Sequence, residues 1–153
     1  NYYPCYSEPM SQGTRCRQLA EYVVFESPLN MLCDSPTNYD REEECTEFIA
    51  TIPTVWEQTI AMNGEIGKYI TMARRKGDVW YVGSLTNWDA RTLTLDLSFL
   101  GAGRWKAEMF HDGVNANRLA SDYQKTVTDI PASRKLTVKM AQGGGCALKI
   151  YKE

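Results

Sequence analysis

The sequence predicts an α+β protein in which a helix–strand–helix segment precedes an all-antiparallel β-sandwich of seven or eight strands. Two observations carry this prediction. Helical apolar periodicity occurs before residue 56, whereas the rest of the chain consists of short alternating or β-branched runs separated by turns. Residues 69–97 form a three-stranded meander with one apolar face, and such a face needs a second layer to cover it.

The first helix is predicted from residue 14 to about residue 27, where it ends because the residue before Pro28 avoids the helical region. The next run, residues 29–33, is short, apolar and bounded by prolines, so it is predicted as a buried strand of a parallel sheet. Four residues at helical spacing form the apolar face of the first helix: Cys16, Leu19, Ala20 and Val23.

A second helix is predicted to begin at Asp40, which forms a capping pattern with Glu43, and to end at Pro53. Residues 42–44 place three carboxylates in its first turn, where the helix dipole favours negative charge. Residues 13–55 thus contain too little structure to bury their own apolar surface. The apolar stripe of this helix consists of Cys45, Phe48, Ile49 and Ile52.

The predicted strands cover residues 59–62, 69–72, 79–82, 92–97, 104–111, 123–130, 136–140 and 146–150. In most of them apolar and polar residues alternate, which places one set of side chains on a buried face. The residues predicted to form the core are Trp80, Val82, Leu93, Leu95, Trp105, Val127, Leu136, Val138, Leu148 and Ile150.

The composition is that of an ordinary globular chain, with 153 residues, 43% hydrophobic and 24% charged. A net charge of −2 without a clustered basic surface argues against a nucleic-acid partner. No apolar run approaches the roughly 20 residues that cross a bilayer, so no membrane association is expected. The chain begins at Asn1, so we expect the natural protein to begin further upstream, and the residues themselves are silent on compartment.

The cysteines show no metal-type or redox-type spacing, so they are predicted to be small buried residues and not a disulfide framework. They are Cys5, Cys16, Cys33, Cys45 and Cys146.

The chain contains no recognisable catalytic constellation. Its only histidine, His111, stands beside a turn and is interpreted as a polar cap. Residues 112–117, with Asp122, offer oxygen atoms at alternating positions, but the spacing is not that of a calcium loop, and turn chemistry explains the same residues. The glycines at 143–145 lead into a strand and are interpreted as a sharp bend. The sequence therefore predicts no catalytic residue, no metal ligand and no cofactor within this chain.

Trp88 is the one candidate for a binding residue that the residue pattern itself suggests. It lies in a turn between two predicted strands, whereas Trp80 and Trp105 have the alternating neighbours of core residues. An exposed Trp88 ring would favour stacking against a sugar, and a buried ring would favour a scaffolding role.

Several motifs occur together in one order: GTRCRQLAEYVVFESPLNMLCDSPTNY, the acidic helix with CTEFI, ARRKGDVWYVGSLTNWDARTLTLDLSFLG, HDGVNANRLASDY and QGGGCALKIY. From about Gly13 to Tyr151 the chain resembles the C-terminal part of glycoside hydrolase family 97, a family of bacterial α-glucosidases and α-galactosidases. The resemblance implies a parent with an N-terminal β-sandwich, a central (β/α)8 barrel and a C-terminal β-sandwich.

On this resemblance, residues 1–58 are the end of the barrel, with its last helices and eighth strand, and residues 59–153 are the C-terminal sandwich. The family's catalytic carboxylates and calcium ligands lie in segments before this chain, so none is carried over onto a residue here. Calcium is expected in the parent's barrel. If residues 29–33 are the eighth strand, Asp34 lies at the barrel rim and is a candidate substrate-binding residue, although a turn cap before Pro36 explains it better.

The functional expectation is a catalytically inactive, structural C-terminal region of a calcium-dependent α-glycoside hydrolase whose substrate is an oligosaccharide. A carbohydrate-binding module and a cell-surface interaction domain are the alternatives. The resemblance implies a periplasmic or secreted protein. The apolar faces of the first 55 residues, without a barrel to cover them, predict either packing against the sandwich or self-association.

Overall fold

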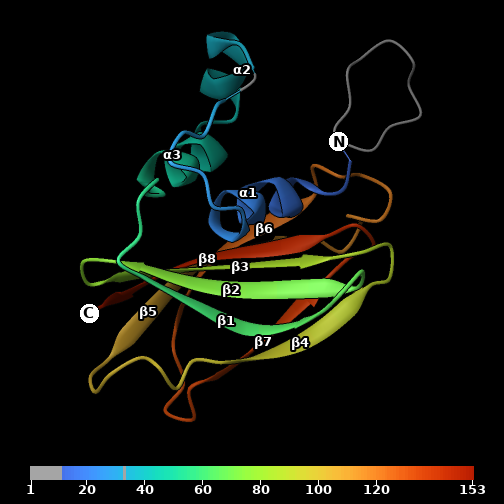
Figure 1. Ribbon diagram of the computed structural model, residues 1–153. Helices are drawn as coiled ribbons and strands as arrows, with labels where there is room; N and C mark the ends of the chain where they lie inside the picture. Colours follow the sequence, from blue (N-terminus) through green and yellow to red (C-terminus); the bar gives the residue numbers. More distant parts are fainter. Residues whose placement is uncertain (1–11, 33) are drawn as a thin grey trace.

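The computed structural model describes residues 12–32 and 34–153, and these contain three helices and eight strands. Figure 1 shows the helices on one side of a broad antiparallel sheet, with a smaller pair of strands on the other side. The elements are α1 (Arg15–Val24), α2 (Pro36–Arg41), α3 (Glu43–Thr51), β1 (Gln58–Glu65), β2 (Tyr69–Lys76), β3 (Val79–Thr86), β4 (Arg91–Asp96), β5 (Trp105–Asp112), β6 (Tyr123–Asp129), β7 (Lys135–Met140) and β8 (Gly145–Lys152).

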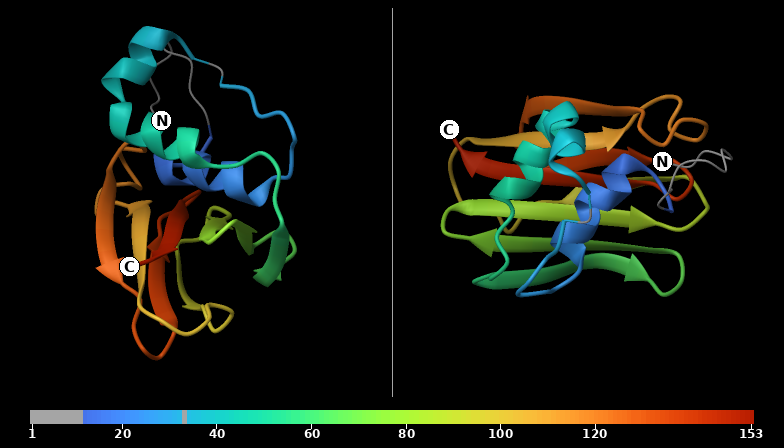
Figure 2. Two further views of the ribbon diagram at one scale, coloured as in Figure 1. Left: turned by 90° about the vertical axis from the view of Figure 1, so that its left-hand side faces the viewer. Right: turned by 90° about the horizontal axis from the view of Figure 1, so that it is seen from above.

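The strands form two sheets in which every pairing is antiparallel. The larger sheet has the order β1-β2-β3-β8-β5-β6, and β4 pairs with β7 in the smaller one. Figure 2 shows the resulting layers: helices, six-stranded sheet, two-stranded sheet. The predicted antiparallel sandwich of seven or eight strands is therefore confirmed, with eight.

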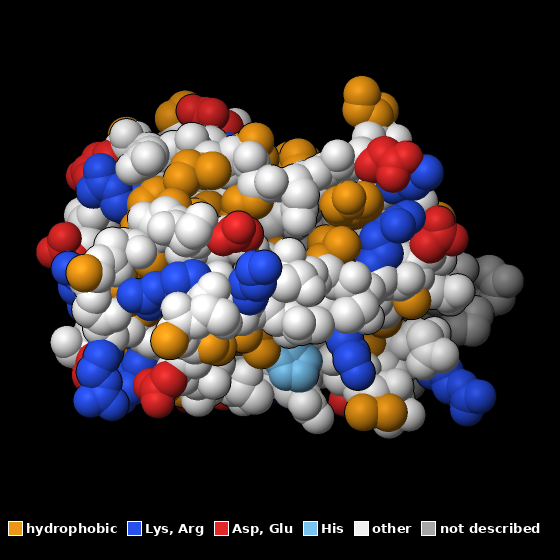
Figure 3. All heavy atoms as spheres, turned by 90° about the horizontal axis from the view of Figure 1, so that it is seen from below, with side chains coloured by type: hydrophobic (Ala, Val, Ile, Leu, Met, Phe, Trp, Pro, Cys, Tyr) orange, Lys and Arg blue, Asp and Glu red, His pale blue; other side chains and the backbone are white. Residues whose placement is uncertain are grey.

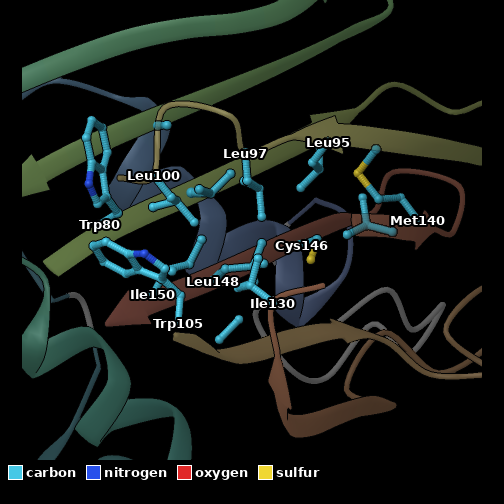
Figure 4. Close-up of a cluster of buried hydrophobic side chains, with 14 residues drawn as sticks. Trp80, Leu95, Leu97, Leu100, Trp105, Ile130, Met140, Cys146, Leu148 and Ile150 are labelled. Atoms are coloured by element: carbon cyan, nitrogen blue, oxygen red, sulfur yellow. The ribbon is translucent and has the colours of Figure 1, made fainter. Parts of the chain in front are cut away.

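The main core lies between the two sheets. Trp80 and Trp105 are each 5% exposed, and the Trp80 ring packs against Phe99 with a centroid distance of 4.4 Å. Figure 4 shows these rings at one end of the cluster, next to Leu100 and Ile150, with Leu95 and Met140 toward its other end. Leu93 and Leu136 are partly buried against this core. The other predicted core residues that are buried are Val82, Leu95, Val138, Leu148 and Ile150.

The prediction for Val127 is wrong, because this side chain is 60% exposed. Val127 lies opposite Glu108 on the edge strand β6, so it shares the helix-side face with Lys125 and not the core face. The sequence alternates correctly along this strand, but the valine lies on the helix-side face at a position that the helices do not cover.

The helix α1 lies on the outer face of the six-stranded sheet and contacts mainly β3 and β8. Its predicted apolar stripe, Cys16, Leu19, Ala20 and Val23, is buried there as expected. The Thr14 hydroxyl accepts a hydrogen bond from the Arg17 backbone N–H and caps the helix. The backbones approach closely, since a Cβ on Gly83 would lie 2.7 Å from the Ala20 carbonyl oxygen.

The predicted strand at residues 29–33 is wrong for the described part, residues 29–32, which belong to neither sheet. Leu29 and Met31 are 74% and 73% exposed. Among residues 12–32 and 34–153, every strand pairs within one of the two antiparallel sheets, and none of them offers the parallel neighbour that would hold this run as a barrel strand. Cys33 lies outside the described residues.

The predicted helix start at Asp40 is also wrong. Ser35 accepts a hydrogen bond from the Asn38 N–H and caps α2, and Pro36 occupies its first turn. The helix α2 ends at Arg41, and the next residue, Glu42, precedes α3 without forming a side-chain cap. The Ser-Pro signal thus starts a short helix one turn before the acidic pattern that suggested Asp40.

The helix α3 is fixed to the sheet, whereas α2 is not. Phe48 packs against Phe110 with a centroid distance of 4.7 Å, and the Tyr123 hydroxyl donates to Glu44 at 2.8 Å. Arg15 of α1 forms an ion pair with Glu42. The helix α2 has no buried residue, and Figure 1 shows it projecting away from the sandwich.

Three cysteines within the described residues, Cys16, Cys45 and Cys146, are buried free thiols, as predicted. Burial raises the pKa of the Cys16 and Cys146 thiols, which keeps them protonated and unreactive. Cys5 and Cys33 lie outside the described residues. No helix in the described part of the chain has the length and apolar character needed to span a membrane.

Candidate functional site

A pocket of about 540 Å³ opens at one end of the sandwich, where β5, β6 and β7 meet two loops. Its polar lining comes from the end of β5, the loop after it, the start of β6, β7 and the following turn. These side chains are His111, Asp112, Asn117, Gln124, Lys139 and Gln142.

The pocket follows from the unequal width of the two sheets. His111 lies opposite Gln124 on one side and Cys146 on the other, so all three side chains share the inner face of the large sheet. Cys146 belongs to the core, but the small sheet contacts mainly β5 and β8, and Gln124 at the start of β6 is exposed. Figure 3 shows the chain's one histidine at the surface on this side of the molecule.

Asp112 is among the residues that line the pocket, and it is buried, at 9% exposed. Its Oδ2 accepts hydrogen bonds from the backbone N–H groups of Ala141 at 2.8 Å and Gly145 at 3.2 Å. Burial raises the pKa of this carboxyl, and hydrogen bonds from Thr14 and the two backbone N–H groups oppose that rise. A Cβ on Gly144 would lie 2.0 Å from Oδ2, so the carboxylate occupies the space that the glycine leaves. Asp112 therefore holds the glycine turn in place.

The loop after β5 is built by turn hydrogen bonds. The Asp122 carboxylate accepts the Asn115 N–H at 2.7 Å, and the Gly113 N–H donates to the Asp122 carbonyl at 2.9 Å. The Asp122 oxygen atoms thus accept hydrogen bonds from the backbone of the loop itself, which is turn chemistry of the kind that the sequence suggested.

Trp88 lies beside the pocket and is 56% exposed. One side of its ring packs on the glycine turn, since a Cβ on Gly143 would lie 2.7 Å from a ring carbon. The turn that carries Trp88 is itself fixed, because the Asn87 carbonyl accepts the Gly143 N–H at 2.8 Å. The ring is therefore an exposed and supported platform, which is the state that favours a binding role.

Asp34 lies far from this arrangement in the fold, at the start of α2. Its carboxylate accepts hydrogen bonds from the Ser35 N–H and from the Asn38 side chain, and these bonds lower its pKa. This is the turn cap that the sequence also suggested. The strand that would have placed Asp34 at a barrel rim is missing here, so a substrate-binding role for it stays a prediction.

A second hollow of about 450 Å³ lies between α2 and α3 and is lined by Asp40, Glu43 and Glu47. These carboxylates are spaced at helical intervals on exposed helix surface. They lack the enclosed surroundings in which a carboxyl group becomes a general acid.

Sequence reasoning found Trp88 but not the polar pocket beside it. Asn117, Gln124, Lys139 and Gln142 come from four separate segments, and no single motif contains more than one of them. No signal in the sequence shows that the end of β5, the start of β6 and the end of β7 lie close together.

Comparison with known proteins gives a consistent picture. The family model described as "Glycosyl-hydrolase 97 C-terminal, oligomerisation" matches residues 55–151. A protein of Bacteroides thetaiotaomicron named "Retaining alpha-galactosidase" is 63% identical over 150 residues, which cover 98% of this chain and 23% of that protein. The chain therefore spans about a quarter of the length of this curated relative.

Solved structures extend the likeness to the helices. A glycoside hydrolase family 97 enzyme from Pseudoalteromonas sp., in complex with acarbose, aligns with a TM-score of 0.87 at 39% identity. The alignment covers 92% of this chain and 23% of the enzyme. A β-arabinopyranosidase aligns with a TM-score of 0.77 at 26% identity, over 90% of this chain and 21% of the other.

Proposed function

Because the chain belongs to glycoside hydrolase family 97, whose C-terminal region it contains, we propose that it is the non-catalytic C-terminal part of a retaining α-galactosidase. The observation that carries the proposal is the 63% identity, over 98% of the chain, to a protein of that name. The resemblance left α-glucosides and α-galactosides open, and this identity favours the galactoside.

The described side chains support a non-catalytic role. Glycoside hydrolysis uses two carboxyl groups on opposite sides of one bond. The larger pocket has a single carboxylate, Asp112, and backbone N–H groups already occupy its Oδ2. In this proposal the catalytic pair and the calcium site lie in the preceding part of the protein, which is periplasmic or secreted. The carboxylates of Asp112 and Asp122 accept backbone hydrogen bonds and do not fit a calcium site here.

The structural role that we propose is to close the preceding barrel. The segment that leaves α1 carries apolar side chains that the sandwich does not cover: Phe25, Leu29 and Met31 are 57%, 74% and 73% exposed. This surface is suited to contact the upstream part of the protein, with residues 1–58 belonging to the barrel and residues 59–153 forming the sandwich. At the same time α1 and α3 pack on the sandwich and join the two parts.

Two proteins test the proposal: the full-length product of the gene and the 153-residue chain alone. The full-length protein should hydrolyse nitrophenyl α-galactoside faster than nitrophenyl α-glucoside and release the α-anomer first, as seen by NMR. The chain alone should show no turnover. Turnover by the chain that disappears on substitution of one of its own residues would overturn the non-catalytic role. A preference of the full-length protein for the glucoside would overturn the proposed α-galactoside specificity.

The same exposed segment predicts the association state of the isolated chain. Without the upstream part of the protein, the chain should self-associate at micromolar concentration in sedimentation velocity, because association removes these exposed apolar side chains from water. Met31→Ser combined with Leu29→Ser should reduce that association. A chain that sediments as a monomer before any substitution would contradict this interpretation of the segment.

A further inference from the structure

We propose that Trp88 and the pocket beside it, whose apolar walls carry several amide side chains, form a binding site for a neutral oligosaccharide, separate from the site of hydrolysis. The proposal rests on the proposed function only for the choice of sugar, an α-galactoside. The ring would carry the apolar face of one sugar unit, and the pocket would bind the hydroxyl groups of the next.

The first argument is the chemistry of the pocket lining. Asn117, Gln124 and Gln142 each offer an amide, which both donates and accepts hydrogen bonds, and His111 adds an imidazole. A sugar hydroxyl group also donates and accepts hydrogen bonds, so it can form one bond of each kind with neighbouring amide side chains. The volume of about 540 Å³ lies in the range of pockets that hold small ligands.

The second argument is the position of the aromatic ring. Trp88 is only two residues from Ala90, and its ring packs on Gly143, which follows Gln142; Ala90 and Gln142 both line the pocket. The ring and the pocket are therefore adjacent, because both contact the turn that contains Gln142 and Gly143. An apolar ring left 56% exposed and fixed on its other side loses little conformational freedom when a ligand stacks on it.

The third argument is charge. Lys139 brings one cation, and the buried Asp112 brings one carboxylate that already accepts hydrogen bonds from the protein. A single lysine beside three amides is a poor counterpart for a multiply charged ligand, because charged ligands are held by paired or clustered charges. The lining therefore favours a neutral, hydroxyl-rich ligand over a phosphate.

The test is an NMR titration of the 15N-labelled 153-residue chain with raffinose, an α-galactoside, and in parallel with inorganic phosphate. Raffinose should shift the Trp88 indole N–H and the side-chain amides of Asn117, Gln124 and Gln142, with a dissociation constant on the order of 1 mM, as expected for a small ligand on an open surface. Phosphate should leave these signals unchanged.

Variants separate stacking from hydrogen bonding. Trp88→Ala should weaken raffinose binding about ten-fold, whereas Trp88→Phe keeps a flat ring and should recover most of the affinity. Gln124→Ala should weaken binding without removing it. The matched control is Phe25→Ala, because Phe25 is 57% exposed and lies on the segment after α1; this variant should leave raffinose binding unchanged. Thermal unfolding of each variant checks that it folds.

Each outcome decides the proposal. Shifts at other residues, an equal loss in Phe25→Ala, or full binding by Trp88→Ala and Gln124→Ala would overturn it. Binding of phosphate without raffinose would show an anion site in its place. Failure here leaves the proposed function intact if the full-length protein hydrolyses the α-galactoside, and failure of that hydrolysis leaves raffinose binding by the chain as a separate result.

Discussion

The two faces of the six-stranded sheet are covered in different ways. The inner face meets the small β4–β7 sheet and is closed by apolar side chains, with Trp80 and Trp105 among them. The outer face meets α1 and α3 and combines a smaller apolar cluster with polar links between layers. Apolar packing dominates between the sheets, where Arg91 of β4 also donates a hydrogen bond to the Thr86 hydroxyl of β3 at 3.0 Å. Between the helices and the sheet, a smaller apolar cluster is combined with several hydrogen bonds.

Three of the polar links on the outer face have the same form: a side chain of one layer donates to a backbone carbonyl of the other. Arg74 of β2 donates to the Val24 carbonyl at 3.0 Å, and Arg17 of α1 donates to the Thr86 carbonyl at 2.8 Å. The Tyr81 hydroxyl donates to the Thr51 carbonyl at 2.6 Å. Such bonds fix the ends of α1 and α3 at defined places on the sheet, which an apolar stripe by itself does not do.

The largest effect is expected at the inner face. Trp105→Ala should lower the free energy of unfolding by about 3–5 kcal/mol, because it removes a buried indole and its hydrogen bond to the Gly101 carbonyl. Urea unfolding followed by circular dichroism measures the change. Val127→Ala, on the exposed side of β6, should cost about 0.5 kcal/mol or less. Equal costs for both variants would contradict the assignment of the two faces.

Gly83→Ala tests how closely α1 lies on the sheet. The added methyl group would meet the Ala20 carbonyl oxygen at 2.7 Å and the Val23 Cβ at 2.9 Å, so the helix must move. We expect a loss of about 1–3 kcal/mol in urea unfolding, as for an overpacked core. Gly101→Ala is the control, since no atom lies within 4 Å of the added Cβ. A neutral Gly83→Ala would mean that α1 is not seated as described.

Arg74→Met tests a polar link without removing apolar bulk. The Arg74 side chain is 3% exposed and donates a hydrogen bond to the Val24 carbonyl. Its Nη1 also lies 3.4 Å from Oε2 of Glu26. Its loss should cost about 1–3 kcal/mol, because a buried carbonyl loses its partner. Glu26→Gln should be close to neutral, since the Glu26 side chain is 75% exposed. Hydrogen exchange should report the damage first at the end of α1.

Asp112 links the two regions, because it ties the glycine turn to the N-terminal end of α1, and its effect should appear as a pH dependence. Its pKa is raised in the folded protein, so the folded state binds this proton more tightly than the unfolded state does. The stabilising contribution is present below the unfolded pKa, about 3.9, and is lost as pH rises through the folded pKa.

Asp112→Asn, which cannot ionise, removes this component. The difference in unfolding free energy between the natural chain and the variant should therefore be largest at low pH and shrink as pH rises. Urea unfolding of both proteins from pH 4 to pH 8 measures it. A difference that grows with pH would show that the carboxylate, and not the protonated acid, is the stabilising form.

Prediction from the sequence succeeded where one segment carries its own signal. The alternation of Leu136 with Val138, and the helical spacing of Cys16 with Leu19, each report a buried face without reference to any partner. The turns between the strands were equally local, because glycine, asparagine and aspartate favour them for backbone reasons. The resemblance to family 97 added the order of these parts.

Tertiary structure decided everything that depends on which segments become neighbours. The placement of β8 between β3 and β5 joins segments far apart in the chain, and no local pattern encodes it. Val127 alternates as a core residue does, yet it is exposed because β6 is an edge strand whose helix-side face is covered only near Tyr123. The pocket likewise depends on packing, because the small sheet is narrower than the large one and leaves the amide side chains beside it exposed. Periodicity determines which side chains share a face, and only the packing of the layers determines whether that face is covered.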